Sequence, residues 1–359
     1  MAAPKWFDEV DNLRGFGIIA VILIHVCGGI HESNLNALVI TNMFIAVFSG
    51  AFAVPLFIFV SGFSLSNKYS GSFSYSSFLK KRLKFIMPPY IVFSLFYLIC
   101  SNGLNSMHSL HTIFHMVLTQ NYNGFLWFIP LIMQFYLLYP LIIRVYDYLN
   151  NTSKLKLLFG LALALQMSWD IITFGQPIGA SILFISHLSY FLLGIYTARN
   201  YELVKLNIIN IKNTIIYELI TLSLVFTTML TYIWLIRFDY IDSYFKLTAL
   251  YFILPPSLLL TLSIIILVLC IRASLYLTEV NNLYAYVFRS FGRRSFGIYL
   301  VHIYFIFILL GKILENFGLS VSNWSYYFLL FTMTSLLSYL VVYLMEFVPH
   351  SELLKGTHK

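Results

Sequence analysis

The chain has 359 residues, of which 60% are apolar and only 10% are charged, and its mean hydropathy is +0.83. Soluble domains carry charge on about a quarter of their residues, so this composition excludes an ordinary soluble domain and indicates a polytopic membrane protein. The net charge of +8 does not require a nucleic-acid partner, because basic loops on one side of a membrane and their attraction to anionic lipids account for it.

Hydropathy predicts an all-α bundle of about ten membrane-spanning helices that form a single domain over residues 1–359. The expected spans lie near residues 13–31, 43–66, 85–101, 125–146, 155–170, 179–198, 213–236, 247–271, 295–314 and 324–348. No small-residue cleavage site follows the first span, so we expect it to remain as a membrane helix. The longest connection is expected between Arg272 and Arg294, with no soluble domain at either end.

The basic residues predict the orientation of these spans. If the N-terminus is cytoplasmic and the spans alternate, 19 of the 22 Lys and Arg residues fall on the inner side. The other three are Arg237, Lys246 and Lys312. This asymmetry satisfies the positive-inside rule and predicts that both termini are cytoplasmic.

Neither the cysteines nor the histidines predict a metal site. The three cysteines, all in apolar segments and without zinc-ligand spacing, are expected to be buried thiols: Cys27, Cys100 and Cys270. His108, His111 and His115 have the spacing of one helical face, but residues 101–124 contain no carboxylate or cysteine to join them. We therefore expect no metal, and an outer loop that touches a substrate.

The first span contains two ionisable residues, in the stretch VDNLRGFGIIAVILIHV at residues 10–26. Arg14 and His25 are eleven residues apart, which places them on one helix face, about 16 Å apart along the axis. A topology anchor is the alternative role for Arg14, and a hydrogen bond to a neighbouring helix is the alternative for His25. An ionisable group inside a membrane nevertheless indicates a functional site, and a neutral imidazole can act as a general base.

Two segments near the next expected loop carry polar or basic residues. The stretch VPLFIFVSGFSLS at residues 54–66 contains Ser61, although close helix packing through small residues also explains it. The stretch FLKKRLKFIMPPY at residues 78–90 carries a basic cluster at a helix start that Pro88 and Pro89 are expected to mark. Such a cluster suits phosphate groups and lipid anchoring equally.

Polar residues also occur inside two later spans. Gln134 lies in the middle of LWFIPLIMQFYLLYP at residues 126–140. In SFGIYLVH at residues 295–302, Ser295, Tyr299 and His302 share one helical stripe. Hydrogen bonds between membrane helices are the alternative explanation for this stripe.

Taken together, these segments resemble the acyltransferase family 3 membrane proteins, which include bacterial O-acetyltransferases of surface glycans. The resemblance rests on DNLRG with the later histidine at residues 11–25, VPLFIFVSGF at 54–63, KRLKFIMPPY at 81–90, LWFIPLIMQFYLLYP at 126–140 and SFGIYLVH at 295–302. It implies a fold of about ten helices in the bacterial plasma membrane, of the stand-alone type without an esterase-like domain. It also implies transfer of an acyl group from cytoplasmic acyl-CoA to a carbohydrate hydroxyl.

The resemblance also assigns roles to individual residues. Arg14 and His25 match the family's arginine and histidine of the first helix, where the histidine is regarded as catalytic. The family's two arginines before the third helix map onto Arg82 and Phe85, so only the first is kept here. Lys81 or Lys84 could supply the positive charge that the family's second arginine would carry at Phe85.

These residues lead to one mechanistic hypothesis and two alternatives. Acyl-CoA, most commonly acetyl-CoA, is expected as a co-substrate rather than a bound cofactor, with its phosphates on a cationic rim of Arg14, Lys81, Arg82, Lys84, Arg293 and Arg294. His25 is expected to take the proton of the acceptor hydroxyl, and the donors that could stabilise the oxyanion or bind substrate are Ser61, Gln134, Tyr299 and His302. Membrane lipids and a carbohydrate acceptor are the expected partners. The alternatives are a transporter or flippase for a glycan or lipid-linked sugar, and an acyltransferase acting on a lipid or small molecule.

Overall fold

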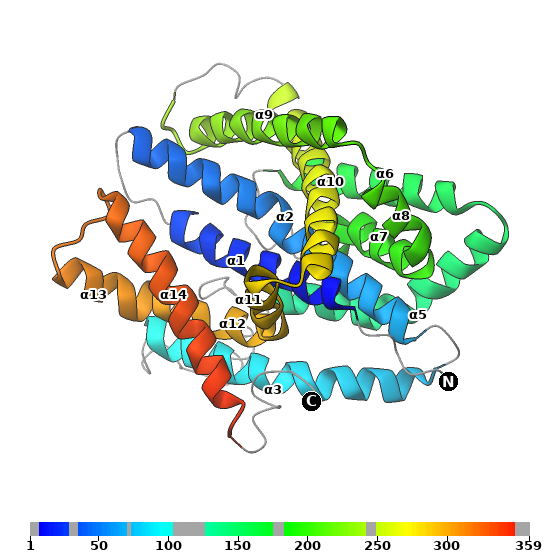
Figure 1. The fold of residues 1–359 in the computed structure, drawn as a ribbon, viewed down its shortest axis with the longest axis horizontal. Helices are drawn as coiled ribbons and strands as arrows, with labels where there is room; N and C mark the ends of the chain where they lie inside the picture. Colours follow the sequence, from blue (N-terminus) through cyan, green and yellow to red (C-terminus); the bar gives the residue numbers. More distant parts are fainter. Residues whose placement is uncertain are drawn as a thin grey trace. The chain divides into compact units, whose positions relative to one another are not determined.

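The computed structural model describes residues 7–28, 35–69, 73–102, 126–174, 183–241 and 249–348, and the regular elements there are helices (Figure 1). The longer helices are α1 (Asp8–Gly28), α2 (Ala37–Lys68), α3 (Tyr75–Asn102), α5 (Phe128–Asn151), α6 (Leu155–Thr173), α9 (Asn213–Arg237), α10 (Ala249–Val280) and α14 (Trp324–Met345). The shorter ones are the 3-10 helix η3 (Phe184–His187), α7 (Leu188–Arg199), α8 (Tyr201–Ile209), α11 (Leu283–Arg293), α12 (Ser295–Ile303), the π-helical η5 (Tyr304–Leu310) and α13 (Gly311–Asn316).

The predicted all-α membrane bundle is confirmed. Within the described ranges, nine helical stretches are long and apolar enough to cross a membrane, and each overlaps one of the predicted spans. The stretch Ser295–Asn316 combines α12, η5 and α13. The predicted span at 179–198 corresponds to η3 and α7, and its first residues lie outside the described ranges.

The third helix differs from the prediction at its start. Pro88 and Pro89 were expected to mark that start, but α3 begins at Tyr75 and both prolines lie inside it. Proline favours the first turn of a helix, which is why the sequence pattern indicated a boundary. In membrane helices, however, neighbouring groups and small local adjustments satisfy the backbone carbonyl that an internal proline leaves without a donor. The basic cluster is therefore part of the helix.

The long connection predicted between Arg272 and Arg294 is also wrong. α10 continues to Val280, and α11 follows over Leu283–Arg293. Because α11 is amphipathic, with polar and basic residues between its apolar ones, a search for uniformly apolar segments does not detect it.

The chain forms two compact units, which are described separately. The first unit contains Met1–Lys68, Tyr190–Ser295 and Phe305–Leu337, and the second contains Tyr69–Ser189, Phe296–Tyr304 and Ser338–Lys359. In the first unit, α1 packs against α2, α10 and α11, and α10 also packs against α2, α8 and α9 (Figure 1). In the second unit, α5 packs against α3, α6 and η3.

Within the first unit, helix ends that the charge rule places on the same side of the membrane lie together. At the predicted cytoplasmic side, the start of α1 is bonded to α8 and to the end of α10, through Glu9 with Tyr201 and Asn12 with Thr278. At the opposite side, Val39 and Met43 of α2 form an apolar cluster with Leu235 of α9. These contacts agree with alternating directions for α1, α2, α9 and α10.

Glycines set the contact between α2 and α7. A Cβ at Gly62 would lie 2.3 Å from the carbonyl oxygen of Phe191, and a Cβ at Gly194 would lie 2.1 Å from the carbonyl oxygen of Phe59. Both neighbours are backbone atoms, so the two helices can approach this closely only without side chains. The small residue next to Ser61 therefore serves helix packing, as its sequence context indicated.

Arg272 of α10 holds the turn between α8 and α9. Its guanidinium donates hydrogen bonds to the carbonyl oxygens of Ile208 (3.0 Å) and Ile211 (2.7 Å) and to Oδ1 of Asn213 (3.1 Å). Arg272→Lys keeps the charge but loses the fork of donors, so we expect the free energy of unfolding to fall by about 1.5–3 kcal/mol. Denaturant unfolding in detergent measures this change. The matched control is Lys212→Gln on the same turn, which should stay within about 0.5 kcal/mol of the wild type because Lys212 is exposed.

Candidate functional site at the start of α1

α1 carries both residues that the first span pointed to. The helix is uninterrupted from Asp8 to Gly28, so Arg14 and His25 lie on one face, about 16 Å apart along the axis. His25 is half-buried and lies in the last turn of the described helix rather than in its middle. The helix begins earlier than hydropathy predicts because the acidic residues of its first turn suit a helix N-terminus, although they are not apolar.

Arg14 is held by a buried carboxylate. Its guanidinium donates to Oδ1 of Asp11 at 3.1 Å and to the hydroxyl oxygen of Ser64 on α2 at 3.2 Å. Asp11 is only 1% exposed, and its second oxygen accepts a hydrogen bond from Nε of Arg293 at 3.0 Å. One buried carboxylate therefore binds two guanidinium groups, which is the pairing that a buried charge requires.

A second carboxylate extends this network. Asp8 accepts a hydrogen bond from Arg289 at 2.8 Å and lies 3.7 Å from Nη2 of Arg293. We name the five residues Asp8, Asp11, Arg14, Arg289 and Arg293 the aspartate–arginine cluster. With three arginines and two aspartates it is net positive, and the side chains of Arg14 and Arg293 are 30% and 54% exposed. Two of its cations can therefore reach a ligand.

Close backbone packing holds α11 against α1. A Cβ at Gly292 would lie 1.8 Å from the carbonyl oxygen of Asp11, and one at Gly15 would lie 2.2 Å from the carbonyl oxygen of Phe288. These glycines fix the position from which Arg289 and Arg293 reach α1. Arg294, the residue after α11, donates a hydrogen bond to the hydroxyl oxygen of Ser290 on that helix at 2.7 Å.

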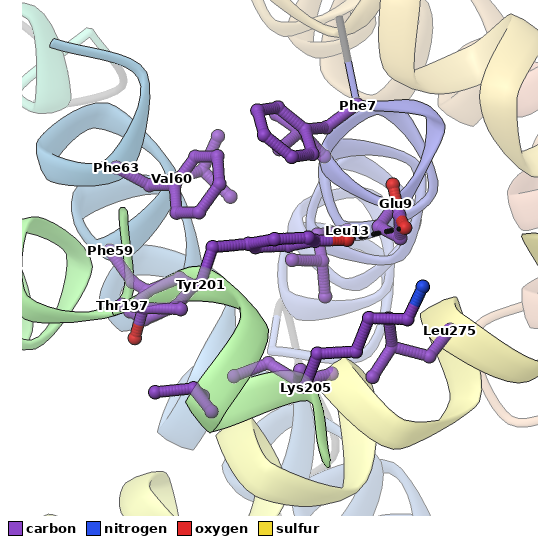
Figure 2. Close-up of a pocket in the computed structure, with 13 residues that line it drawn as sticks. Phe7, Glu9, Leu13, Phe59, Val60, Phe63, Thr197, Tyr201, Lys205 and Leu275 are labelled. Atoms are coloured by element: carbon purple, nitrogen blue, oxygen red, sulfur yellow. Dashed lines mark hydrogen bonds between the residues drawn. The ribbon is translucent and has the colours of Figure 1, made fainter. Parts of the chain in front are cut away.

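A recess lies near the same end of the first unit, among α1, α2, α7, α8 and α10 (Figure 2). Its volume is about 430 Å³, including open solvent at its mouth, and its walls are mainly apolar. Figure 2 shows Tyr201 pointing toward Glu9, to which its hydroxyl donates a hydrogen bond of 2.7 Å. Burial, and then Glu9, raise the pKa of Tyr201 above its usual value, so it stays a neutral donor. Neither Arg14 nor His25 lines this recess.

In the second unit, the structure distinguishes Arg82 from the rest of the basic cluster on α3. Its guanidinium carbon lies 5.2 Å from the ring centre of Tyr136, 5.7 Å from that of Phe78 and 6.0 Å from that of Tyr69. Lys81 and Lys84 are exposed, whereas Arg82 is half-buried in this aromatic cage. Among the described residues it has neither a hydrogen-bond nor an ion-pair partner. Aromatic faces orient a guanidinium without using its N–H groups, which stay available to an anion.

Gln134 serves the fold of the second unit. Its Oε1 accepts a hydrogen bond from the backbone N–H of Phe184 at 3.2 Å, and its Nε2 donates to the carbonyl oxygen of Pro130 at 3.3 Å. The first bond joins η3 to α5, and the second lies within α5.

Tyr299 and His302 contact each other on α12, as their spacing predicts. Their ring centres are 5.8 Å apart, and both side chains are buried. Nδ1 of His302 lies 2.7 Å from the carbonyl oxygen of Tyr299, so the hydrogen bond stays within the helix instead of joining two helices. The bond requires the tautomer with its proton on Nδ1.

Ser61 lies nearer to Arg14 than to His25. On α2 it stands between Phe57, whose ring faces Gly17, and Ser64, which accepts a hydrogen bond from Arg14. Gly17 is eight residues before His25, so Ser61 lies at least about 12 Å from His25 along the axis of α1. Its hydroxyl oxygen is buried and finds no hydrogen-bond partner within the described part of the chain.

The predicted site residues fall into two groups. His25, Arg14, Ser61, Arg293 and Arg294 belong to the first unit. Lys81, Arg82, Lys84, Gln134, Tyr299 and His302 belong to the second. His108, His111 and His115 lie outside the described residues. Sequence reasoning missed Asp8, Asp11 and Arg289, although the i, i+3 spacing of Asp11 and Arg14 within DNLRG was a usable signal.

The fold and these groups define an integral membrane protein, a polytopic helix bundle with ionisable residues on its first spanning helix. The chain belongs to the acyltransferase family whose sequence model, described as "Acyltransferase domain", matches residues 7–343. This match confirms the resemblance seen in the sequence and makes the chain a membrane acyltransferase by family.

The chain is also similar to proteins from Staphylococcus aureus. The chain is 26% identical over 308 residues to the "Probable poly-beta-1,6-N-acetyl-D-glucosamine export protein" of Staphylococcus aureus strain MSSA476, covering 82% of this chain and 81% of the relative. The protein of the same name from strain MRSA252 gives the same values. No solved structure matches the chain.

Proposed function

We propose that this protein is a membrane O-acyltransferase that moves an acyl group, normally acetyl, from cytoplasmic acyl-CoA to a hydroxyl of a carbohydrate at the bacterial plasma membrane. The observation that carries this proposal is the pair of Arg14 and His25 on one uninterrupted helix of a family acyltransferase domain. The pair joins a cationic helix end to a titratable group about 16 Å further along the axis.

The arginines supply the donor site in this proposal. Within the first unit, Arg14 is the proposed ligand of the acyl-CoA phosphates, supported by Arg293 and Arg294. Within the second unit, Arg82 is the proposed phosphate ligand, supported by the exposed Lys81 and Lys84. Guanidinium groups suit this task because they present a planar fork of donors to phosphate oxygens.

His25 acts as the general base. It accepts the proton of the acceptor hydroxyl while that oxygen forms a bond to the thioester carbon, and it returns the proton to the sulfur when the carbon–sulfur bond breaks. Four donors were expected for the developing oxyanion: Ser61, Gln134, Tyr299 and His302. Ser61 lies at least about 12 Å from His25 along the axis of α1, which is too far to donate to an oxygen that forms beside the base, so Ser61 is not retained in this role. Gln134, Tyr299 and His302, which belong to the second unit, stay predictions.

A carbohydrate acceptor is supported by the names of the relatives, which refer to poly-beta-1,6-N-acetyl-D-glucosamine. The same names favour a second candidate function, export of a polysaccharide. The two functions predict different outcomes for the acyl donor, because an acyltransferase consumes it and an exporter does not.

The test uses the purified chain in proteoliposomes with radiolabelled acetyl-CoA. Oligosaccharides, phospholipids and small alcohols are offered as separate acceptors, and each product is identified by its gain in mass. Label on the carbohydrate supports the proposed function. Label only on a lipid or small alcohol assigns a different acceptor, and movement of glycan across the bilayer without acetyl-CoA consumption favours export.

Arg82→Ala is expected to raise the KM for acetyl-CoA by about tenfold or more, because a charge-assisted hydrogen bond contributes about 1.5–3 kcal/mol. The kcat should change little, since the phosphates are bound equally in the ground state and the transition state. Steady-state transfer assays give both constants.

Two further variants sharpen this result. Arg82→Lys keeps a cation within the aromatic cage and should recover part of the affinity. Lys80→Ala removes an exposed cation from the same helix and should change the KM less than twofold. Equal KM values for Arg82→Ala and the wild type would remove Arg82 from the donor site.

A further inference from the structure

We propose that Asp11 is a positioning residue for the donor site, and that its buried carboxylate holds Arg14 and Arg293 in the orientation that binds the phosphates of acyl-CoA. The inference rests on the proposed function. It adds that the aspartate–arginine cluster orients its arginines for the ligand, in addition to supplying their positive charge. Asp11 itself does not touch the donor.

The geometry places the carboxylate between the two arginines. Oδ1 accepts a hydrogen bond from Nη1 of Arg14 at 3.1 Å, and Oδ2 accepts one from Nε of Arg293 at 3.0 Å. Arg14 stands on the same helix as Asp11, whereas Arg293 is 282 residues away in the chain. Each carboxylate oxygen thus fixes one guanidinium, and together they set the spacing between two cations from different helices.

The arginines keep donors for a ligand after binding Asp11. A guanidinium offers five N–H donors, and the hydrogen bonds described here engage Nη1 and Nη2 of Arg14 and Nε of Arg293. Both side chains are partly exposed, whereas Asp11 is 1% exposed. A phosphate can therefore approach the arginines from the open side without displacing the carboxylate.

Two opposite effects of Asp11 on an anion must be compared. Its negative charge repels a phosphate, so a purely electrostatic role predicts that its removal strengthens binding. Its hydrogen bonds order two arginine side chains that would otherwise sample many rotamers, so a positioning role predicts that its removal weakens binding. The sign of the change in affinity separates the two roles.

We expect positioning to dominate. A phosphate on the exposed side of the arginines is separated from the carboxylate by the guanidinium groups, so the repulsion between the two anions is weakened by distance. Each guanidinium, by contrast, is in direct contact with the carboxylate that orients it. Without the carboxylate, both arginine side chains must be ordered when the ligand binds, so Asp11→Asn is expected to weaken binding of CoA between about tenfold and 100-fold. Ser64→Ala, which removes only the neutral bond to Arg14, is expected to weaken it by about two- to tenfold and does not leave a buried charge unpaired.

The experiment measures binding of coenzyme A to the full chain in nanodiscs by calorimetry, together with the KM and kcat for acetyl-CoA. The variants are Asp11→Asn and Ser64→Ala. The matched control is Glu279→Gln, which removes the same charge from an exposed position near the end of α10. A positioning role predicts a raised Kd and KM at unchanged kcat for the first two variants and wild-type values for the control.

Each other outcome has a defined meaning. Binding by Asp11→Asn as tight as, or tighter than, that of the wild type overturns the inference and leaves the proposed function in place. A lower kcat at unchanged KM shows only a smaller folded fraction and also overturns it. If the wild type itself does not bind coenzyme A, the donor site of the proposed function fails and the inference fails with it.

Discussion

Replacing His25 with alanine is expected to reduce acetyl transfer by about 10²- to 10⁴-fold, the usual contribution of a general base. In the proposed mechanism the imidazole accepts the proton of the attacking hydroxyl, and alanine leaves that proton without an acceptor at this position. Transfer of radiolabelled acetyl from acetyl-CoA to an oligosaccharide measures the loss. Binding of coenzyme A should remain within twofold of the wild type, because Arg14 lies about 16 Å away along the helix axis.

His25→Gln is the matched control for this prediction. Glutamine can keep a hydrogen bond to a neighbouring helix but cannot take up a proton at neutral pH. A base therefore predicts that glutamine is as inactive as alanine, whereas a structural hydrogen bond predicts that glutamine restores transfer. Undiminished transfer by His25→Ala would remove the proposed base altogether.

Gly292→Ala is expected to have the largest effect on stability. The added Cβ would lie 1.8 Å from the carbonyl oxygen of Asp11, which is a backbone atom and cannot rotate away. α11 must therefore move from α1, and we expect a loss at or above the upper end of the 1–3 kcal/mol typical of overpacking. Because Arg293 moves with α11, the affinity for coenzyme A should fall as well. Thermal unfolding in detergent and calorimetry measure the two effects.

Gly160→Ala on α6 is the control for this substitution. A Cβ at Gly160 meets no atom within 4 Å, and the residue is exposed. Alanine favours a helix over glycine by up to about 1 kcal/mol, so stability should stay level or rise. An equal loss of stability in both variants would show that close packing of α11 on α1 is not the cause.

The membrane fold could be predicted because lipid leaves few solutions for the backbone. A buried peptide group in a bilayer needs a partner within its own segment, so a long apolar stretch becomes a helix almost regardless of its neighbours. For the same reason, the shared face of Arg14 and His25 followed from helical geometry alone. The α3 start and the α11 helix were missed because internal prolines and an amphipathic pattern do not show in hydropathy.

The partners of the charged residues could not be predicted in the same way. Arg14, Arg293 and Arg294 carry the same charge in the sequence, but the structure gives them different partners. Arg14 and Arg293 share a buried carboxylate, whereas Arg294 donates a hydrogen bond to Ser290, four residues earlier on α11. The pairing of Arg293 with Asp11 depends on a tertiary contact between segments 282 residues apart. The pairs of Asp11 with Arg14 and of Ser290 with Arg294 are three and four residues apart, so sequence spacing could have indicated these two.

The bonds of the first turns of α1 also bear on how the protein is made. α1 leaves the ribosome early, but Asp8, Glu9 and Asn12 bind residues of α11, α8 and α10, which are translated much later. Until those helices are inserted, the carboxylates of α1 need water or lipid headgroups around them. The N-terminal end of the first helix should therefore stay at the membrane surface during synthesis and complete its packing only when the C-terminal third of the chain arrives.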